Sequence, residues 1–318
     1  MASNFHGKQH NFSDRKLTEG LEHIRLAEKC MKTSLFKWKP DVDGAVEEYK
    51  KAATSFKNAK AYDEAKDMYL KTAELQQQCG AKGSCCNRSY EQAAMICKEN
   101  KEIDQCLHLM QTAATLFQEH GTPDTAALTL DKAAKMVEMN QPEKAIDMYL
   151  KACDVVEIED RPRQCAEYIG KAARLMIRCR RFDEAVETLK KEIDYYTECE
   201  NFELLNKAIM GTVLVHLTQE DYVAADLFFK SCLSLATFGS SEEAGALEDL
   251  LTAYDQGDEE TGRRTLKLPI FKYLDNAFAK LARDLVIPGG VSSQTGNSNA
   301  LQSPGQESAG EAFPDGLC

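Results

Sequence analysis

The chain has 318 residues, of which 43% are hydrophobic and 28% charged, a composition typical of a soluble globular protein. Its net charge of −12 and pI near 5.1 argue against general affinity for nucleic acid, because phosphate binding needs a local or net basic excess. No stretch reaches the roughly 18 apolar residues of a membrane span, and the first residues have no apolar signal-peptide core. We therefore expect a cytoplasmic protein that does not bind nucleic acid.

Motifs that would indicate catalysis or a cofactor are missing from the sequence. There is no phosphate-binding loop, no nucleophile elbow and no zinc-protease motif. The 12 cysteines include no Cys-x-x-Cys pair, and we expect Cys86, Cys97, Cys106 and Cys165 to act as small core hydrophobes. His216 falls at an apolar repeat position, where a core histidine is expected. We predict a binding protein without catalytic residues, cofactor or metal.

The N-terminal part of the chain does not share the pattern of the central part. Residues 1–13 are predicted to be disordered, and a first helix is predicted from about Asp14 to Lys32, with Ser13 or Asp14 as its N-cap. The short segment "SLFKWKP" comes next and contains the only tryptophan. Apolar Leu35, Phe36 and Trp38 alternate there with lysines, which suits insertion into the interface of an anionic membrane. Capping of the open end of the helical array is an equally good interpretation.

A helical repeat fills the central part of the chain. Apolar or small residues recur at positions x, x+4, x+7, x+8 and x+11, as in Ala126, Leu130, Ala133, Ala134 and Val137. Ten such stripes start 19 to 21 residues apart, although Gln76 and Glu192 fit theirs loosely. A fixed period of two helices in about 40 residues is typical of stacked helix hairpins. We predict an all-α, right-handed, tetratricopeptide-like solenoid over residues 14–240.

The period fails near Asp255, where glycines and Pro269 interrupt it. Residues 241–287 are predicted to form a C-terminal helical bundle that caps the solenoid, with a last helix from about Phe271 to Ile287. Residues 288–318 are rich in Ser, Gly, Gln and Asn and are predicted to be a disordered tail.

Several of these features together resemble a known family. The tandem helices of about 20 residues, "FKWKPD", "FKNAK", "HGTPDTAA", "GRRTLKLPIFKYLDNAFAKL" and the "GLC" ending look like the soluble attachment proteins of the N-ethylmaleimide-sensitive fusion ATPase, NSF, and most resemble its gamma branch. The resemblance covers about Leu17 to Ile287 and the terminal residues. The resemblance is convincing because it extends over most of the chain, and not because of any single motif.

The resemblance implies a cytoplasmic, peripherally membrane-associated adaptor that binds the syntaxin-containing SNARE four-helix bundle, recruits NSF and stimulates it to disassemble the bundle. It places SNARE contacts at Lys57, Lys60, Lys98 and Lys171. Other basic positions of the family's alpha branch fall on Thr122, Leu128 and Glu167, which puts SNARE affinity or choice in question. It also implies a penultimate ATPase-stimulating leucine, Leu317. Acidic residues that fit NSF docking are Glu242, Glu243, Asp258, Glu259 and Glu260.

Two other functions remain open from the residues alone. One is a tetratricopeptide-like scaffold or co-chaperone that binds another helical or peptide partner, although the 34-residue period and clustered Lys, Asn and Arg of a carboxylate clamp are not found. The other is an enzyme with a site hidden between helices. An ATPase-stimulation assay with and without SNARE bundle discriminates among the three.

Overall fold

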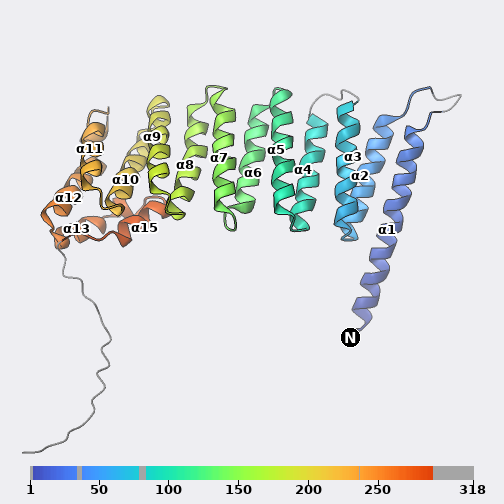
Figure 1. The fold of residues 1–318 in the computed structure, drawn as a ribbon, viewed down its shortest axis with the longest axis horizontal. Coiled ribbons are helices and arrows are strands. Elements are labelled where there is room, and N and C mark those ends of the chain that lie inside the picture. The colour runs from blue at the N-terminus through green and yellow to red at the C-terminus, as the bar shows by residue number, and fades with distance from the viewer. Residues whose placement is uncertain (1–2, 34–37, 79–83, 236, 289–318) are drawn as a thin grey trace, which may run out of the picture.

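The computed structural model describes residues 3–33, 38–78, 84–235 and 237–288. All regular structure in these ranges is helical, and they contain no strand. Figure 1 shows the helices standing side by side in one elongated array, with sequential helices antiparallel. The predicted all-α, tetratricopeptide-like solenoid with a C-terminal cap is confirmed. No helix in the described ranges has the length and apolar character needed to cross a membrane.

The solenoid consists of α1 Ser3–Met31, α2 Val42–Asn58, α3 Tyr62–Gln78, α4 Ser84–Glu99, α5 Ile103–Glu119, α6 Pro123–Val137, α7 Pro142–Glu157, α8 Pro162–Arg178, α9 Phe182–Glu198, α10 Phe202–Thr218 and α11 Tyr222–Cys232. The cap consists of the 3-10 turn η1 Phe238–Ser240 and helices α12 Glu242–Gln256, α13 Glu259–Leu266, α14 Pro269–Lys272 and α15 Asn276–Asp284.

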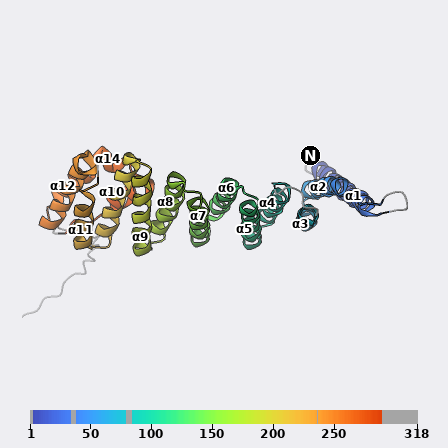
Figure 2. The same ribbon diagram turned by 90° about the horizontal axis from the view of Figure 1, so that it is seen from above.

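From α2 onward the solenoid helices alternate between two rows, as Figure 2 shows from above. We call α2, α4, α6, α8 and α10 the even row, and α3, α5, α7, α9 and α11 the odd row. Side-chain hydrogen bonds join neighbouring helices of the same row, which are two apart along the chain. In the even row they join Thr129 to Glu91 and Lys171 to Asp131. In the odd row they join Lys66 to Glu102, the N-cap residue of α5, and Tyr195 to Glu157. Each row therefore presents one continuous face.

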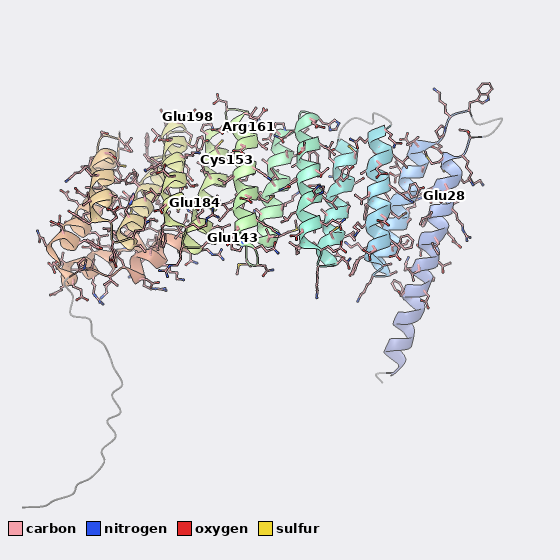
Figure 3. All side chains as sticks on the ribbon, viewed as in Figure 1. Glu28, Glu143, Cys153, Arg161, Glu184 and Glu198 are labelled. Atoms are coloured by element: carbon pink, nitrogen blue, oxygen red, sulfur yellow. The ribbon has the colours of Figure 1, made fainter. Side chains whose placement is uncertain are left out.

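Small residues allow the two rows to pack closely. The alanine pairs Ala133–Ala134 and Ala172–Ala173 are fully buried in one apolar cluster with the large side chain of Tyr149, and Phe56 fills the separate cluster around α1–α3. Buried cysteines serve the same purpose: burial raises the pKa of Cys97 to about 11 and favours the neutral thiol. In Figure 3 Cys153 lies within the stack, whereas Glu143 and Arg161 lie near helix ends. The predicted core role of the cysteines is confirmed at all four predicted positions.

Most helix connections are short turns that contain one left-handed residue. In the first, Lys60 has a φ of 62°, and the Ala61 N–H donates to the Phe56 carbonyl at 2.9 Å. This bond from the residue after the left-handed one is the mark of a Schellman motif. Positive φ recurs at intervals of about 20 or 40 residues, that is, one or two helix periods, at Lys60, Lys101, Gly121, Asp160, Arg180, Glu200 and Glu220. The turn geometry thus has the period of the helices, although only one of these residues is glycine.

Two helix boundaries differ from the sequence prediction. Helix α1 begins at Ser3, which corrects the prediction of disorder for residues 3–13. That segment contains no proline, and extending an existing helix costs far less than nucleating one. At the other end, the single predicted helix from Phe271 to Ile287 is two elements, α14 and α15. The break around Asp275 buries Leu274 and allows Asp275 to reach Arg174 of α8.

Candidate functional site

The apolar loop predicted to contact membrane joins α1 to α2. Leu35 and Phe36 lie outside the described residues. Trp38 is described, and its side chain is 87% exposed. This exposure shows that Trp38 does not cover the end of the solenoid, so the end-cap interpretation does not hold for this residue.

Three of the four predicted SNARE-contact lysines gather at one edge of the solenoid. Lys57 lies in the last turn of α2 and Lys98 in the last turn of α4, while Lys60 lies in the turn after α2. The Lys57 Nζ is 2.9 Å from a carboxylate oxygen of Glu99, the residue after Lys98, so the ends of these two even-row helices are in contact. The structure therefore brings Lys57 and Lys98 together on the even row.

Lys171 lies farther along the same row, in the middle of α8. Its Nζ donates to Asp131 of α6 at 2.7 Å and lies 5.0 Å from the ring centre of Tyr168 and 5.6 Å from that of Tyr149. Burial favours the neutral acid at Asp131, but hydrogen bonds from Lys135 and Lys171 lower the pKa of this carboxyl overall. Lys171 is thus a positioned cation and less mobile than a solvated lysine.

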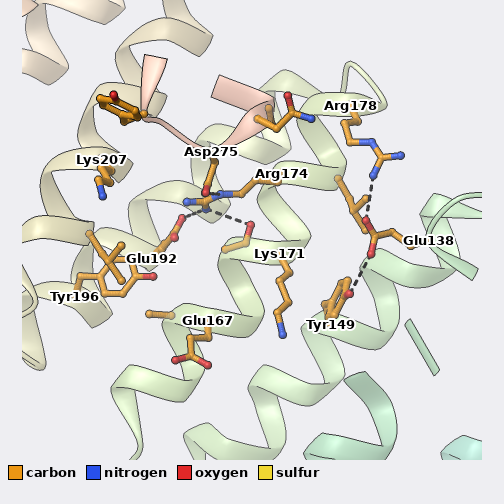
Figure 4. Close-up of a pocket in the computed structure, with 17 residues that line it drawn as sticks. Glu138, Tyr149, Glu167, Lys171, Arg174, Arg178, Glu192, Tyr196, Lys207 and Asp275 are labelled. Atoms are coloured by element: carbon orange, nitrogen blue, oxygen red, sulfur yellow. Dashed lines mark hydrogen bonds and ion pairs between the residues drawn. The ribbon is translucent and has the colours of Figure 1, made fainter. Parts of the chain in front are cut away.

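A pocket of about 680 Å³ opens beside Lys171, where the cap folds back over the solenoid. Figure 4 shows Lys171, Arg178 and Lys207 around it, with Glu138 and Glu167 as the facing carboxylates. Tyr149, Tyr196 and Tyr273 contribute aromatic surface to its lining. The lining contains as many carboxylates as cations, so it suits a polar protein surface with groups of both charges.

An ion-pair network forms one wall of this pocket and attaches the cap to the solenoid. Arg174 of α8 bonds to Glu192 of α9 and, through its Nε at 2.8 Å, to Asp275 ahead of α15. Its guanidinium also lies 4.6 Å from the ring centre of Phe278. The Glu192 side chain is only 1% exposed, so its pairing with Arg174 offsets the cost of burying a carboxylate.

The sequence alone does not identify this network as part of a site, but it carries one signal. Glu192 occupies an apolar repeat position, and a charged residue there requires a buried partner. Gln76, the other loose fit, likewise accepts a hydrogen bond from Ser89 at 2.9 Å. Polar residues that break an apolar stripe thus mark inter-helix contacts in this fold.

The acidic residues predicted to dock the ATPase fall into two separate groups. Glu242 and Glu243 begin α12, whereas Asp258 to Glu260 come after its end, about 22 Å away for a helix of 15 residues. Three of them have structural partners: Glu243 accepts from Asn206 at 3.2 Å, Asp258 caps α13, and Glu259 pairs with Arg263. Glu242 and Glu260 are exposed.

The remaining predicted positions are the penultimate leucine and the positions at which the sequence departs from the family's basic pattern. Leu317 lies outside the described residues. Where the sequence departs from the basic pattern of the resembled family, Leu128 is 52% exposed and Glu167 lines the pocket beside Lys171. These departures put an apolar and an acidic side chain at the surface of the even row.

Comparison with known proteins assigns a family to this architecture. The family model "Soluble NSF attachment protein, SNAP" matches residues 18–267. Similar proteins include gamma-soluble NSF attachment proteins of Dictyostelium discoideum, 29% identical over 91% of this chain and 89% of that one, and of Arabidopsis thaliana, 27% identical over 87% and 92%. An alpha-soluble NSF attachment protein of Vitis vinifera is 25% identical over 68% and 75%.

Similar solved structures are more distant. A signal-transduction ATPase with a tetratricopeptide repeat sensor from Pyrococcus horikoshii has 16% identity and a TM-score of 0.39, covering 71% of this chain and 36% of that one. Aspartyl phosphate phosphatase F from Bacillus subtilis has 16% identity and a TM-score of 0.36, covering 90% and 73%. TM-scores this low support no inference about function, whereas the family match spans most of the solenoid and part of the cap. The chain therefore belongs to the soluble NSF attachment protein family, and it is an adaptor of that family and not an enzyme.

Proposed function

We propose that this adaptor holds a syntaxin-containing SNARE four-helix bundle against its even row at a membrane surface, and presents its C-terminal cap and tail to NSF, whose ATP hydrolysis it stimulates. Family membership supports attachment to NSF and a role in vesicle trafficking. The finer assignment of partners to surfaces rests on the geometry of the two rows.

The observation that carries the proposal is the placement of Lys57, Lys98 and Lys171 on one row. Three row steps separate α2 from α8, so these cations extend over a length on the order of 30 Å at about 10 Å per packed helix. A rod-shaped partner can contact such a surface along its length, and spaced cations steer an acidic rod onto it.

The two ends of the solenoid give the bound rod a direction. The loop with the exposed Trp38 lies at the α1–α2 end, where it can meet a membrane. The acidic helix α12 and Pro288, the last residue that the structure describes, lie at the other end. A SNARE bundle held between them would have its membrane anchors near Trp38 and its far end near NSF.

The decisive experiment is stimulation of NSF ATPase with and without SNARE bundle. The triple charge reversal Lys57→Glu, Lys60→Glu and Lys98→Glu should weaken bundle binding severalfold and flatten its salt dependence, because exposed charges act through screened attraction. A matched control reverses Lys71, Lys151 and Lys191 of the odd row, which are exposed. Equal loss in both variants would place the SNARE surface elsewhere, and NSF stimulation that never depends on SNARE bundle would favour a scaffold with another partner.

The membrane contact is tested separately. Replacing Leu35 and Phe36 with Ser should slow disassembly of liposome-anchored SNARE complexes and leave soluble complexes unaffected. Complete burial of each side chain would be worth roughly 1.5 to 3 kcal/mol, and less at an interface. Equal loss on both substrates would show that the loop supports the solenoid and does not contact lipid.

Leu317 is assigned to stimulation and the acidic cap to docking. Leu317→Ala should leave NSF binding nearly intact and reduce stimulated ATP hydrolysis. Charge reversal of the exposed Glu242 and Glu260 should instead weaken binding. If Leu317→Ala stimulates as well as the unchanged protein, recruitment by the cap accounts for the activity.

A further inference from the structure

The C-terminal cap is divided by charge along the chain. The sequence contains no Lys or Arg between Lys230 and Arg263, a stretch that includes all of the acidic helix α12. From Arg263 to Arg283 the balance reverses: the cations are Arg263, Arg264, Lys267, Lys272, Lys280 and Arg283, and the only acid is Asp275. Because Asp275 bonds to Arg174 of α8, it is already used by the solenoid. One half of the cap is thus strongly basic in a chain with a net charge of −12.

All of these cations except Arg264 line a groove of about 610 Å³ formed by α13, α14, α15 and the segment after α15. Arg263 and Lys267 line it from α13, and Lys280 and Arg283 from α15, with Lys272 between them. Apolar side chains lie among the cations: Phe271 is buried, Leu266 and Leu285 are half-buried, and Val286 is 79% exposed. The groove therefore combines an apolar lining with a cationic rim.

Part of this positive charge is not balanced within the groove. Arg263 pairs with Glu259, and Arg283 with Asp284 at 2.8 Å, which lowers the pKa of Asp284. Within the described ranges, no ion pair up to 4.0 Å involves Lys267, Lys272 or Lys280, all of which are exposed. An acidic peptide with one or two apolar side chains would match both the charge and the lining.

We propose that the groove binds the acidic segment of this chain's own C-terminal tail, residues 307–315, with Phe313 against the apolar lining. Residues 289–318 contain Glu307, Glu311 and Asp315 but no Lys or Arg. The acidic half of the cap repels such a segment, whereas the basic half attracts it. No more than about 25 residues separate Pro288 from Phe313, and a chain of Gly- and Ser-rich composition spans about 25 to 30 Å over that length.

The tail is joined to the cap at the rim of the groove, which favours the tail over a separate partner as the occupant. Val286 lines the groove two residues before Pro288, so the tail starts where it binds. A short tether gives an effective concentration in the millimolar range, so even a weak contact is populated. Its consequence for NSF rests on the proposed function: a docked tail withholds Leu317 until the ATPase competes for it.

Photo-crosslinking in the full chain, without ATPase, tests this docking. With p-benzoylphenylalanine in place of Phe313, we expect crosslinks to residues 263–287 within one chain, and with the same probe at Ser298 few or none. Lys267→Glu, Lys272→Glu and Lys280→Glu together should reduce the crosslink yield severalfold. Adding Glu307→Lys, Glu311→Lys and Asp315→Lys should restore it, because the charges are exchanged. The control reversal of Lys29, Lys151 and Lys191, which are exposed, should keep the full yield.

Three results would overturn the proposal. Crosslinks that join two chains would make a second copy the occupant. Crosslinks spread over the solenoid, or unchanged by the groove reversal, would show no specific site. If the Phe313 probe gives no crosslink, and the protein binds phosphatidylserine vesicles unless Lys267, Lys272 and Lys280 are reversed, then the groove binds lipid. The crosslinking is done without ATPase, so a negative result would not count against the proposed adaptor function. A negative result in the NSF stimulation assay would likewise not count against docking of the tail.

Discussion

The two ends of the solenoid are finished in different ways. At the N-terminal end, α1 packs on one side only, and Leu21 and Leu26 on its other faces are about half exposed. At the C-terminal end, α10 is buried on nearly every face, because the cap covers what the next repeat would otherwise cover. The apolar core divides accordingly into a small cluster around α1–α3 and a large one that runs from α4 through the cap. In stacked repeats, stability depends on contacts with neighbours, so the open end should unfold separately from the closed end.

The largest effect should come from removing the aromatic ring at each end. Phe278 is fully buried, and its ring fills the space that a Cβ on Gly211 of α10 would occupy. Phe278→Ala should cost about 3 to 5 kcal/mol and lower the main urea transition. Phe56, beside Gly20 of α1, makes the matching contact at the open end. Phe56→Ala should mainly raise hydrogen exchange in α1–α3, and a rise along the entire chain would contradict independent ends.

The ion-pair network of Arg174, Glu192 and Asp275 at the closed end should be about as costly to break, because its Glu192 carboxylate is almost completely buried. Arg174→Met leaves the Glu192 carboxylate buried without its partner and should destabilise by about 3 to 5 kcal/mol. Adding Glu192→Gln should recover much of that loss in a double-mutant cycle. Asp275→Asn, on the exposed side of the network, should cost less. If the loss of stability in the double variant equals the sum of the losses in the two single variants, Arg174 and Glu192 do not interact energetically.

Acidification should weaken the closed end through His216 of α10. Burial lowers the pKa of His216 below its ordinary 6.5, although Asp221 opposes the shift. As the pH falls below 6.5, the unfolded chain takes up this proton before the folded chain does, so stability is lost. His216→Gln should flatten the loss between pH 7 and 5, a smaller effect than either substitution above. An unchanged pH profile would show that other groups set the acid sensitivity.

The smallest effects should come from the left-handed turn residues, and they should be alike at both ends. Lys60→Gly and Glu220→Gly should each stabilise by up to about 1 kcal/mol, because a side chain in this region costs about 1 to 2 kcal/mol and glycine does not bear that cost. Gly121→Ala, with a φ of 71°, should destabilise by a similar amount. Thermal unfolding measures all three. A decrease in stability on Lys60→Gly would show that the contacts of the Lys60 side chain outweigh the backbone strain.

Much of the fold could be predicted because packing in a solenoid is local. The apolar template at Ala45 and Ala126 marks helices α2 and α6, since each stripe meets only its neighbours. The break at Asp275 could not be predicted this way. It depends on a contact with Arg174, 101 residues away, which no short-range period reveals.

The candidate site shows the same limit. The sequence places Lys57 and Lys98 at equivalent points of successive repeats, and the structure brings them together on the even row. Lys171 is predicted as a further basic contact, but its position between Tyr149 and Tyr168 depends on helices α7 and α8 meeting at a particular height. The uneven roles of the acidic residues of the cap also depend on distant partners, such as Asn206 for Glu243.

The alternation of rows restricts how this protein can change length. Inserting one helix of about 20 residues would move every later helix to the opposite row, so α8 would present Lys171 on the other side of the molecule. Inserting two helices would restore the parity and only lengthen the distance between Trp38 and the cap. Viable length variants should therefore differ by whole hairpins of about 40 residues. The distance between Trp38 and the cap is thus adjustable only in steps of one hairpin.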